Sequence, residues 1–164
     1  MKDHFASFAA RYLTALLTGL LLMMLHGTVQ HGVLTAVVPQ SDTPWELSKI
    51  VFWPLAICAA GRLRHGFRAV SRDLPALVLA PPAAALLCRG IQMLGGDGRS
   101  FLAVWAAVLA AALAYGPDGG RLFYVWSALA VILAGAYVLL TLQPLLWQPL
   151  LLPGIASAVL FLAD

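Results

Sequence analysis

The stretch Ser41–Pro54, S-D-T-P-W-E-L-S-K-I-V-F-W-P, decides how this chain is organised, because acids, a lysine, tryptophans and prolines gather there between apolar flanks. Thr43 and Glu46 fit the Ser/Thr-x-x-Glu capping box, in which each side chain accepts a backbone N–H at a helix start. Pro44 falls at the first helical position, where its missing N–H costs nothing. We therefore predict that a helix starts at Thr43.

The same helix start places two acids and a lysine between apolar runs. Asp42, Glu46 and Lys49 are spaced i, i+4 and i+7, which places them on one helix face. One interpretation is a capped helix entering a bilayer with a local Glu46–Lys49 ion pair. The other is a polar site at the outer mouth of a helix bundle, because ionisable groups near membrane depth are costly and often functional. Together with His26, these three residues are the candidate ligand- or ion-binding set.

Bulk composition indicates a membrane protein. Of the 164 residues, 62% are hydrophobic and 10% charged, with a mean hydropathy of +0.89. A soluble domain carries about 25% charged residues. The formal net charge of +3 comes largely from arginines beside apolar runs, and no basic stripe on an aqueous surface is available for nucleic acid. We predict an all-α, polytopic transmembrane bundle, one domain over residues 1–164, with the lipid bilayer as its partner and no nucleic acid.

The apolar runs predict five spans and leave a sixth open. The predicted spans are about 8–26, 45–61, 74–94, 101–115 and 122–142. The run 101–115 is shorter than the about 20 residues that a span normally needs. The segment 150–163 is either a sixth span or a re-entrant or surface-lying piece. Between the first two spans, residues 27–40 either extend the first helix or fold back along the membrane surface.

Prolines inside these runs predict bent helices. Pro54 lies in the second span, and Pro81 and Pro82 lie together in the third. Proline removes a helical hydrogen bond, and membrane helices tolerate this where neighbours satisfy the freed carbonyl. We expect helix kinks at these three positions.

An arginine cluster between the second and third spans sets the expected orientation. Arg62, Arg64, Arg68 and Arg72 form the densest basic group in the chain. By the positive-inside rule they face the cytoplasm, where they would contact anionic lipid headgroups. The N-terminus is then cytoplasmic, and the Ser41–Pro54 stretch lies on the outer side.

The stretch resembles the signature of an uncharacterised family of small bacterial and archaeal integral membrane proteins, N-E-S-x-W-E-H-x-K-x-x-F-x-P after a first helix ending in Leu-His. This chain has Leu25-His26 at the end of its first apolar run. The matching residues are Asp42, Thr43, Trp45, Glu46, Lys49, Phe52 and Pro54. The chain departs from the signature at Ser41 and Leu47, which replace Asn and His. The resemblance implies a multi-pass protein of the bacterial inner (plasma) membrane, favours five spans, and implies no reaction.

Three functions are compatible with this organisation. The first is a transporter- or channel-like protein, oligomeric, with its polar site at the outer mouth. The second is an accessory or structural subunit of a larger membrane complex. The third and weakest is a membrane-embedded lipid enzyme, for which no catalytic spacing of Ser, His and Asp is present. His26 and His31 lack a metal-site spacing, so we expect no metal and no cofactor, and an enzyme is the less favoured class.

Overall fold

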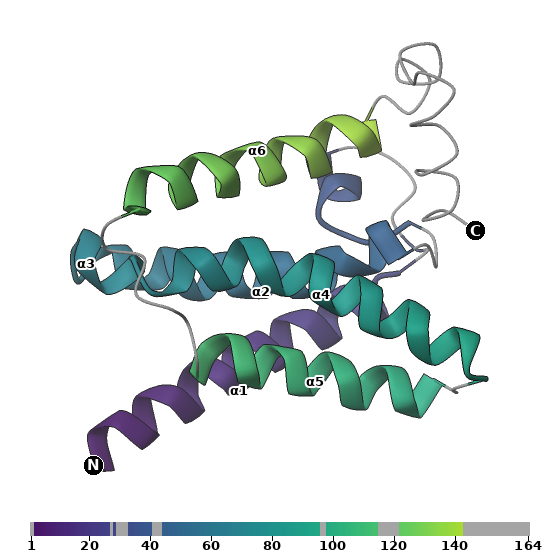
Figure 1. Ribbon diagram of the computed structural model, residues 1–164, viewed down its shortest axis with the longest axis horizontal. Coiled ribbons are helices and arrows are strands. Elements are labelled where there is room, and N and C mark those ends of the chain that lie inside the picture. The colour runs from purple at the N-terminus through teal and green to yellow at the C-terminus, as the bar shows by residue number, and fades with distance from the viewer. Residues whose placement is uncertain are drawn as a thin grey trace.

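The computed structural model describes residues 2–26, 28, 33–40, 44–95, 98–114 and 122–142, and every regular element in those ranges is helical (Figure 1). The long helices are α1 (Lys2–Met24), α2 (Pro44–Leu63), α4 (Asp73–Met93), α5 (Gly98–Ala114) and α6 (Phe123–Leu142). The short 3-10 helix η1 (Val33–Ala36) precedes α2, and the single-turn helix α3 (Phe67–Val70) follows it. The all-α prediction is therefore confirmed over these ranges.

Three of the helices are long and apolar enough to cross a membrane. They are Ala6–Met24 in α1, Asp73–Ile91 in α4 and Phe123–Thr141 in α6. They coincide with the predicted spans 8–26, 74–94 and 122–142. The apolar part of α5, Phe101–Ala114, is shorter, as its sequence predicts. Helix α2, the predicted span 45–61, does not belong to this group, and it carries Glu46, Lys49 and Arg62.

Helix α2 lies at the centre of the bundle. It packs against α1, α4 and α5, and Figure 1 shows α6 on one side of the α2–α4 layer with α1 and α5 on the other. The buried side chains of α2 include Ile50, Val51, Phe52 and Leu55, each at most 3% exposed. They belong to one hydrophobic cluster that also takes in residues of all the other long helices. This central place explains how α2 can carry Glu46, Lys49 and Arg62 and still contribute many buried side chains.

The proline-containing helices are continuous. Helix α2 runs through Pro54, and α4 runs through Pro81 and Pro82. The carbonyl freed by Pro54 is that of Ile50, four residues earlier. Trp105 of α5 donates its Nε1–H to this carbonyl at 3.0 Å. A neighbouring helix thus supplies the hydrogen bond that Pro54 removes, and α2 stays one helix; the predicted kinks stay predictions.

A glycine on α1 makes room for that tryptophan. A Cβ added at Gly19 would lie 2.2 Å from Cζ2 of Trp105 and 3.2 Å from the Ile50 oxygen. Trp105 itself is 3% exposed. Gly19, Ile50 and Trp105 therefore form a close three-helix junction, in which α1 leaves the space that the indole fills.

The segment 33–40 folds into the protein instead of extending α1 or lying along its surface. Ala36 and Val38 are 1% and 2% exposed, and η1 packs against α6. Trp53 of α2 donates its Nε1–H to the Ala36 carbonyl at 3.2 Å. This segment brings backbone carbonyls next to the start of α2.

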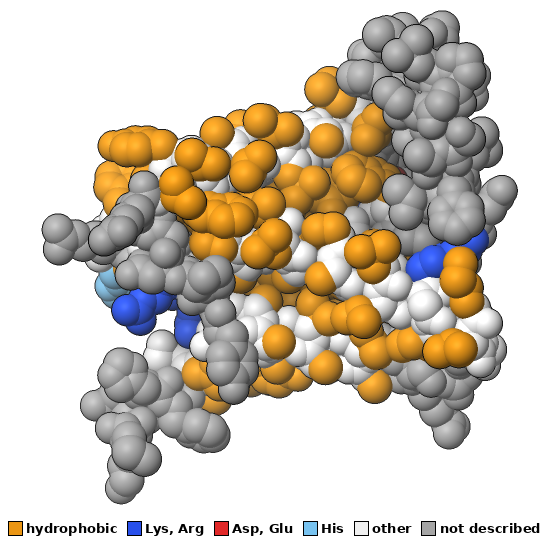
Figure 2. Space-filling model, viewed as in Figure 1, with side chains coloured by type: hydrophobic (Ala, Val, Ile, Leu, Met, Phe, Trp, Pro, Cys, Tyr) orange, Lys and Arg blue, Asp and Glu red, His pale blue; other side chains and the backbone are white. Residues whose placement is uncertain are grey.

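Apolar and charged side chains are distributed over the surface as expected of a protein solvated by lipid. Figure 2 shows one face, with apolar side chains over its middle and Lys, Arg and His side chains at the two ends of the bundle. Large apolar side chains on α1, α4 and α6 are widely exposed, among them Leu17 (58%), Leu86 (65%) and Val131 (71%). Apolar exposure on this scale marks an interaction surface, and the three long apolar helices indicate that it is a membrane.

Some predicted features lie outside the described residues. These are Asp42, Thr43, the side chain of Arg68 and the segment 150–163 with its sixth-span alternative. Helix α2 begins at Pro44, which agrees with the predicted helix start.

Candidate functional site

A buried ion pair forms at the N-terminal end of α2. The Lys49 side chain is 0% exposed, and its Nζ lies 2.6 Å from Oε2 of Glu46, three residues earlier. The Glu46 side chain is 13% exposed. The spacing of three residues places both side chains on one face of α2, as the sequence predicts. Taking two charges out of water costs several kcal/mol per ion unless they are paired and hydrogen-bonded, so this pair depends on its surroundings.

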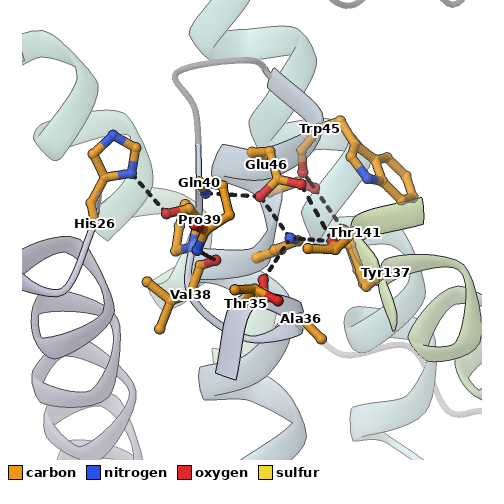
Figure 3. A network of polar contacts seen from close by, with 12 residues as sticks. His26, Thr35, Ala36, Val38, Pro39, Gln40, Trp45, Glu46, Tyr137 and Thr141 are labelled. Atoms are coloured by element: carbon orange, nitrogen blue, oxygen red, sulfur yellow. Dashed lines mark hydrogen bonds and ion pairs between the residues drawn. The ribbon is translucent and has the colours of Figure 1, made fainter. Parts of the chain in front are cut away.

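Two further oxygens complete the environment of Lys49 (Figure 3). Thr141 of α6 places its Oγ1 2.6 Å from Nζ, and the backbone carbonyl of Thr35 in η1 lies 3.3 Å away. The three donor hydrogens of an ammonium group thus meet a carboxylate, a hydroxyl and a carbonyl. These oxygens come from α2, α6 and η1, so the ammonium joins three elements that are distant in sequence.

The loop before α2 holds the Glu46 carboxylate. The backbone N–H of Gln40 donates to Oε2 of Glu46 at 3.0 Å. Oε1 of Glu46 accepts from the Thr141 hydroxyl at 3.5 Å. The Gln40 side chain donates to the Val38 carbonyl at 2.9 Å, which fixes the loop. Glu46 is therefore oriented from two sides, while the Thr43 half of the predicted capping box lies outside the described residues.

A second buried polar contact lies beside the ion pair. The hydroxyls of Ser48 and Tyr137 are 2.6 Å apart, and Ser48 also donates to the Trp45 carbonyl at 2.6 Å. Tyr137 is 1% exposed and packs its ring against those of Trp45 and Phe52, with centroids 4.6 and 5.0 Å away. Phe52 and Tyr137 belong to the hydrophobic core cluster, and Trp45 packs against it.

His26 lies at the same end of the molecule but not beside the ammonium. Its Nδ1 is 3.0 Å from the Pro39 carbonyl, and a carbonyl only accepts, so Nδ1 carries the proton in this contact. Figure 3 shows its ring on the α1 side of Pro39 and Gln40, with Glu46 on the other side. Of the four predicted site residues, the structure thus joins Glu46 to Lys49 directly and connects His26 through the 39–40 loop; Asp42 lies outside the described residues.

Sequence reasoning missed Thr35, Gln40, Tyr137 and Thr141. Thr35 and Gln40 contribute backbone groups, which no side-chain pattern predicts. Tyr137 and Thr141 had a signal: they are two of the few polar residues in α6, and their i, i+4 spacing puts them on one face.

The other end of α2 carries a separate charged cluster. Asp73 accepts from Nη1 of Arg62 at 2.8 and 2.9 Å and lies 3.4 Å from Nη1 of Arg11. Arg64 and Arg72 are exposed. Sixteen residues of α-helix separate Glu46 from Arg62, or about 24 Å along the axis. The predicted outer site and the arginine-rich bend therefore lie at opposite ends of α2.

The chemistry open to the Lys49 site is that of hard cations and protons. All its ligands are oxygens, which suit such cations, and within the described ranges no group of three or more His, Cys, Asp or Glu side chains could hold a metal ion. Comparison with protein-family models, with curated proteins and with solved structures found no match.

Proposed function

We propose that this chain is a transporter- or channel-like protein of the bacterial plasma membrane, and that Glu46 and Lys49 handle a small cation or a proton at its outer end. The observation that carries the proposal is the fully buried Lys49 ammonium among the oxygens of Glu46, Thr141 and Thr35. An apolar pair of similar volume at such a position is often as stable or more so. A buried ion pair at membrane depth therefore supports a functional role.

The site can exchange its cation in two ways. A proton can move from Nζ of Lys49 to Oε2 of Glu46 over the 2.6 Å between them, which leaves a neutral amine and a neutral acid; the acid can then release that proton, and the amine can take up another. Alternatively, a small cation can displace the ammonium and take over the same oxygens. The Thr141 hydroxyl contacts both Lys49 and Glu46. Either change therefore alters a hydrogen bond made by α6, which links the charge state of the site to the position of α6.

The arrangement of charges supports an orientation with the N-terminus in the cytoplasm. The arginine-rich bend after α2 faces the cytoplasm in this proposal, with exposed Arg64 and Arg72 at the headgroups. Glu46 and Lys49 then lie near the outer side. Helices α1, α2, α4, α5 and α6 are the five proposed spans, with α2 shielded from lipid by its neighbours.

The test is ion flux through purified protein in sealed vesicles. The double variant Glu46→Gln/Lys49→Met removes both charges together and leaves no buried charge unpaired. We expect it to fold and to lose proton, Na⁺ or K⁺ flux by roughly tenfold or more, because a charge-assisted hydrogen bond contributes about 1.5–3 kcal/mol. A pH-sensitive dye and ion-selective dyes inside the vesicles measure the flux.

The matched control is Ser48→Ala. Ser48 lies on the same helix as Glu46 and Lys49, and its substitution removes the buried contact with Tyr137 of α6 without changing a charge. This variant should therefore lower the melting temperature and preserve the flux. Flux that survives in the double variant, or falls equally in both variants, contradicts the proposal.

A second candidate is an accessory subunit of a larger membrane complex or of a homo-oligomer. It is favoured by α6, of which only 11% of the span is buried within the chain, against 44% for α4. Another protein could cover such a face as well as lipid. The same purification separates the two: a pure protein without flux that co-purifies with a stoichiometric partner supports the accessory role.

A further inference from the structure

A cavity lies between the first half of α1 and the C-terminal end of α2, away from the Lys49 site. Its volume is about 430 Å³, within the range of about 300–1,000 Å³ that is usual for small-molecule sites. Its polar lining comprises Ser7, Arg11, Thr14, Arg62, Arg64 and His65. The first three follow one another at i, i+4 and i+7, so α1 turns a single polar face towards α2.

The charges around this cavity do not balance. No carboxylate is among the described lining residues, and the two lining arginines Arg62 and Arg11 both pair with Asp73. One carboxylate between two guanidinium groups leaves one positive charge. Arg64 adds a second, since no ion pair joins it to an acid in the part of the chain described. Counted over the side chains that the structure describes, the cavity is therefore a net cationic site beside the arginine-rich bend.

Guanidinium donors at the cavity are also left unused. Nε of Arg11 is buried and has no hydrogen-bond partner among the described residues. Buried donors in folded proteins nearly always have a partner. Both bonds from Arg62 to Asp73 use Nη1 alone, so the rest of that guanidinium fork is not engaged with the carboxylate. The guanidinium donors that line the cavity thus outnumber the carboxylate acceptors that the described residues supply, and an anion with several oxygens would meet those that face the cavity.

We propose that this cavity binds a phosphate group, supplied either by the headgroup of an anionic lipid or by a free phosphate compound. Guanidinium groups match the tetrahedral oxygens of phosphate with paired, charge-assisted hydrogen bonds. Arg11, Arg62 and Arg64 surround the phosphate, and the Ser7 hydroxyl adds a neutral donor. This role is distinct from general attraction of the bend to anionic lipid, because Arg11 belongs to α1 and only the cavity brings it together with Arg64.

The experiment uses the purified full chain and two probes. Inorganic phosphate is titrated in detergent by calorimetry, and the melting temperature is measured in nanodiscs of phosphatidylcholine alone or with phosphatidic acid. We expect at least one probe to bind. Arg64→Gln should weaken this binding by about tenfold, which is the change in affinity expected from the loss of one charge-assisted hydrogen bond. Arg64 is exposed and outside the Asp73 pairs, so this variant leaves the fold intact.

The matched control is Arg72→Gln. Arg72 is exposed near the same bend and does not line the cavity, so its loss removes an equal charge and should leave affinity unchanged. Stabilisation by phosphatidic acid without phosphate binding identifies the lipid as the source, and binding of both identifies a free phosphate compound. No effect of either probe, or an equal loss in Arg72→Gln and Arg64→Gln, overturns the proposal. Neither result bears on flux through the Lys49 site.

Discussion

At the scale of single residues, the molecule depends on the mutual neutralisation of Glu46 and Lys49. Lys49 is fully buried and Glu46 is 13% exposed, and the two form an ion pair at 2.6 Å. Removal of one partner from such a pair typically costs about 3–5 kcal/mol, because the remaining charge has no compensation. Removal of one charge therefore lowers the free energy of unfolding strongly, whereas removal of both changes it little.

We therefore expect Lys49→Met to lower the free energy of unfolding by about 3–5 kcal/mol, and the double variant Glu46→Gln/Lys49→Met to recover most of that loss. Denaturation in mixed detergent micelles measures both values. Tyr124→Phe serves as the control, because Tyr124 lies on α6 but is 85% exposed. A double variant as unstable as the single one would show that the charges do not compensate each other.

Local spacing explains how much of this site the sequence predicts. Glu46 and Lys49 are three residues apart, so a helix alone brings them together. Thr141 is 92 residues from Lys49, and only the packing of α6 against α2 makes them neighbours. The same holds for the Thr35 carbonyl, which reaches the site because residues 33–40 fold inward instead of following α1.

At the scale of elements, the integrity of α2 depends on a hydrogen bond from another helix. Pro54 frees the Ile50 carbonyl, and the Trp105 indole satisfies it. The sequence predicts the orphaned carbonyl from Pro54 alone. It does not predict the donor, since Trp105 lies 55 residues away in an alanine-rich run whose packing partner the pattern does not specify.

Trp105→Phe should lower the free energy of unfolding by about 1–3 kcal/mol, the cost of a buried acceptor left without a partner. In a Pro54→Ala background the residue-54 N–H returns to the Ile50 carbonyl, so the same tryptophan substitution should cost distinctly less. Unfolding of all four proteins gives the coupling between the two positions. Equal costs in both backgrounds would mean that Trp105 acts by volume alone.

At the scale of the whole molecule, the two charged ends and the apolar band between them are what composition predicts best. Sixty-two per cent hydrophobic residues cannot coat a water-soluble surface, and the described helices expose their leucines and valines accordingly. What composition does not predict is that α2, with Glu46, Lys49 and Arg62 along its length, lies at the centre of the bundle.

We expect the two ends to lie on opposite sides of the membrane. In a Cys58→Ala/Cys88→Ala background, Thr28→Cys and His65→Cys place single thiols at the two ends, both at exposed positions. A membrane-impermeant maleimide should label Thr28→Cys in intact spheroplasts and His65→Cys only after lysis, because the arginine-rich bend stays inside. Labelling of both from one side would contradict the proposed orientation.

The indole that caps the Ile50 carbonyl also dictates an order of events during synthesis. Helix α2 leaves the ribosome long before α5, so it enters the insertion machinery with one backbone oxygen unmet and a lysine that still awaits α6. A lone carbonyl in hydrocarbon costs several kcal/mol, so α2 gains little by partitioning into lipid at that stage. We therefore expect the second long helix to be made to be the last to settle, and to remain beside the translocon until the later helices arrive.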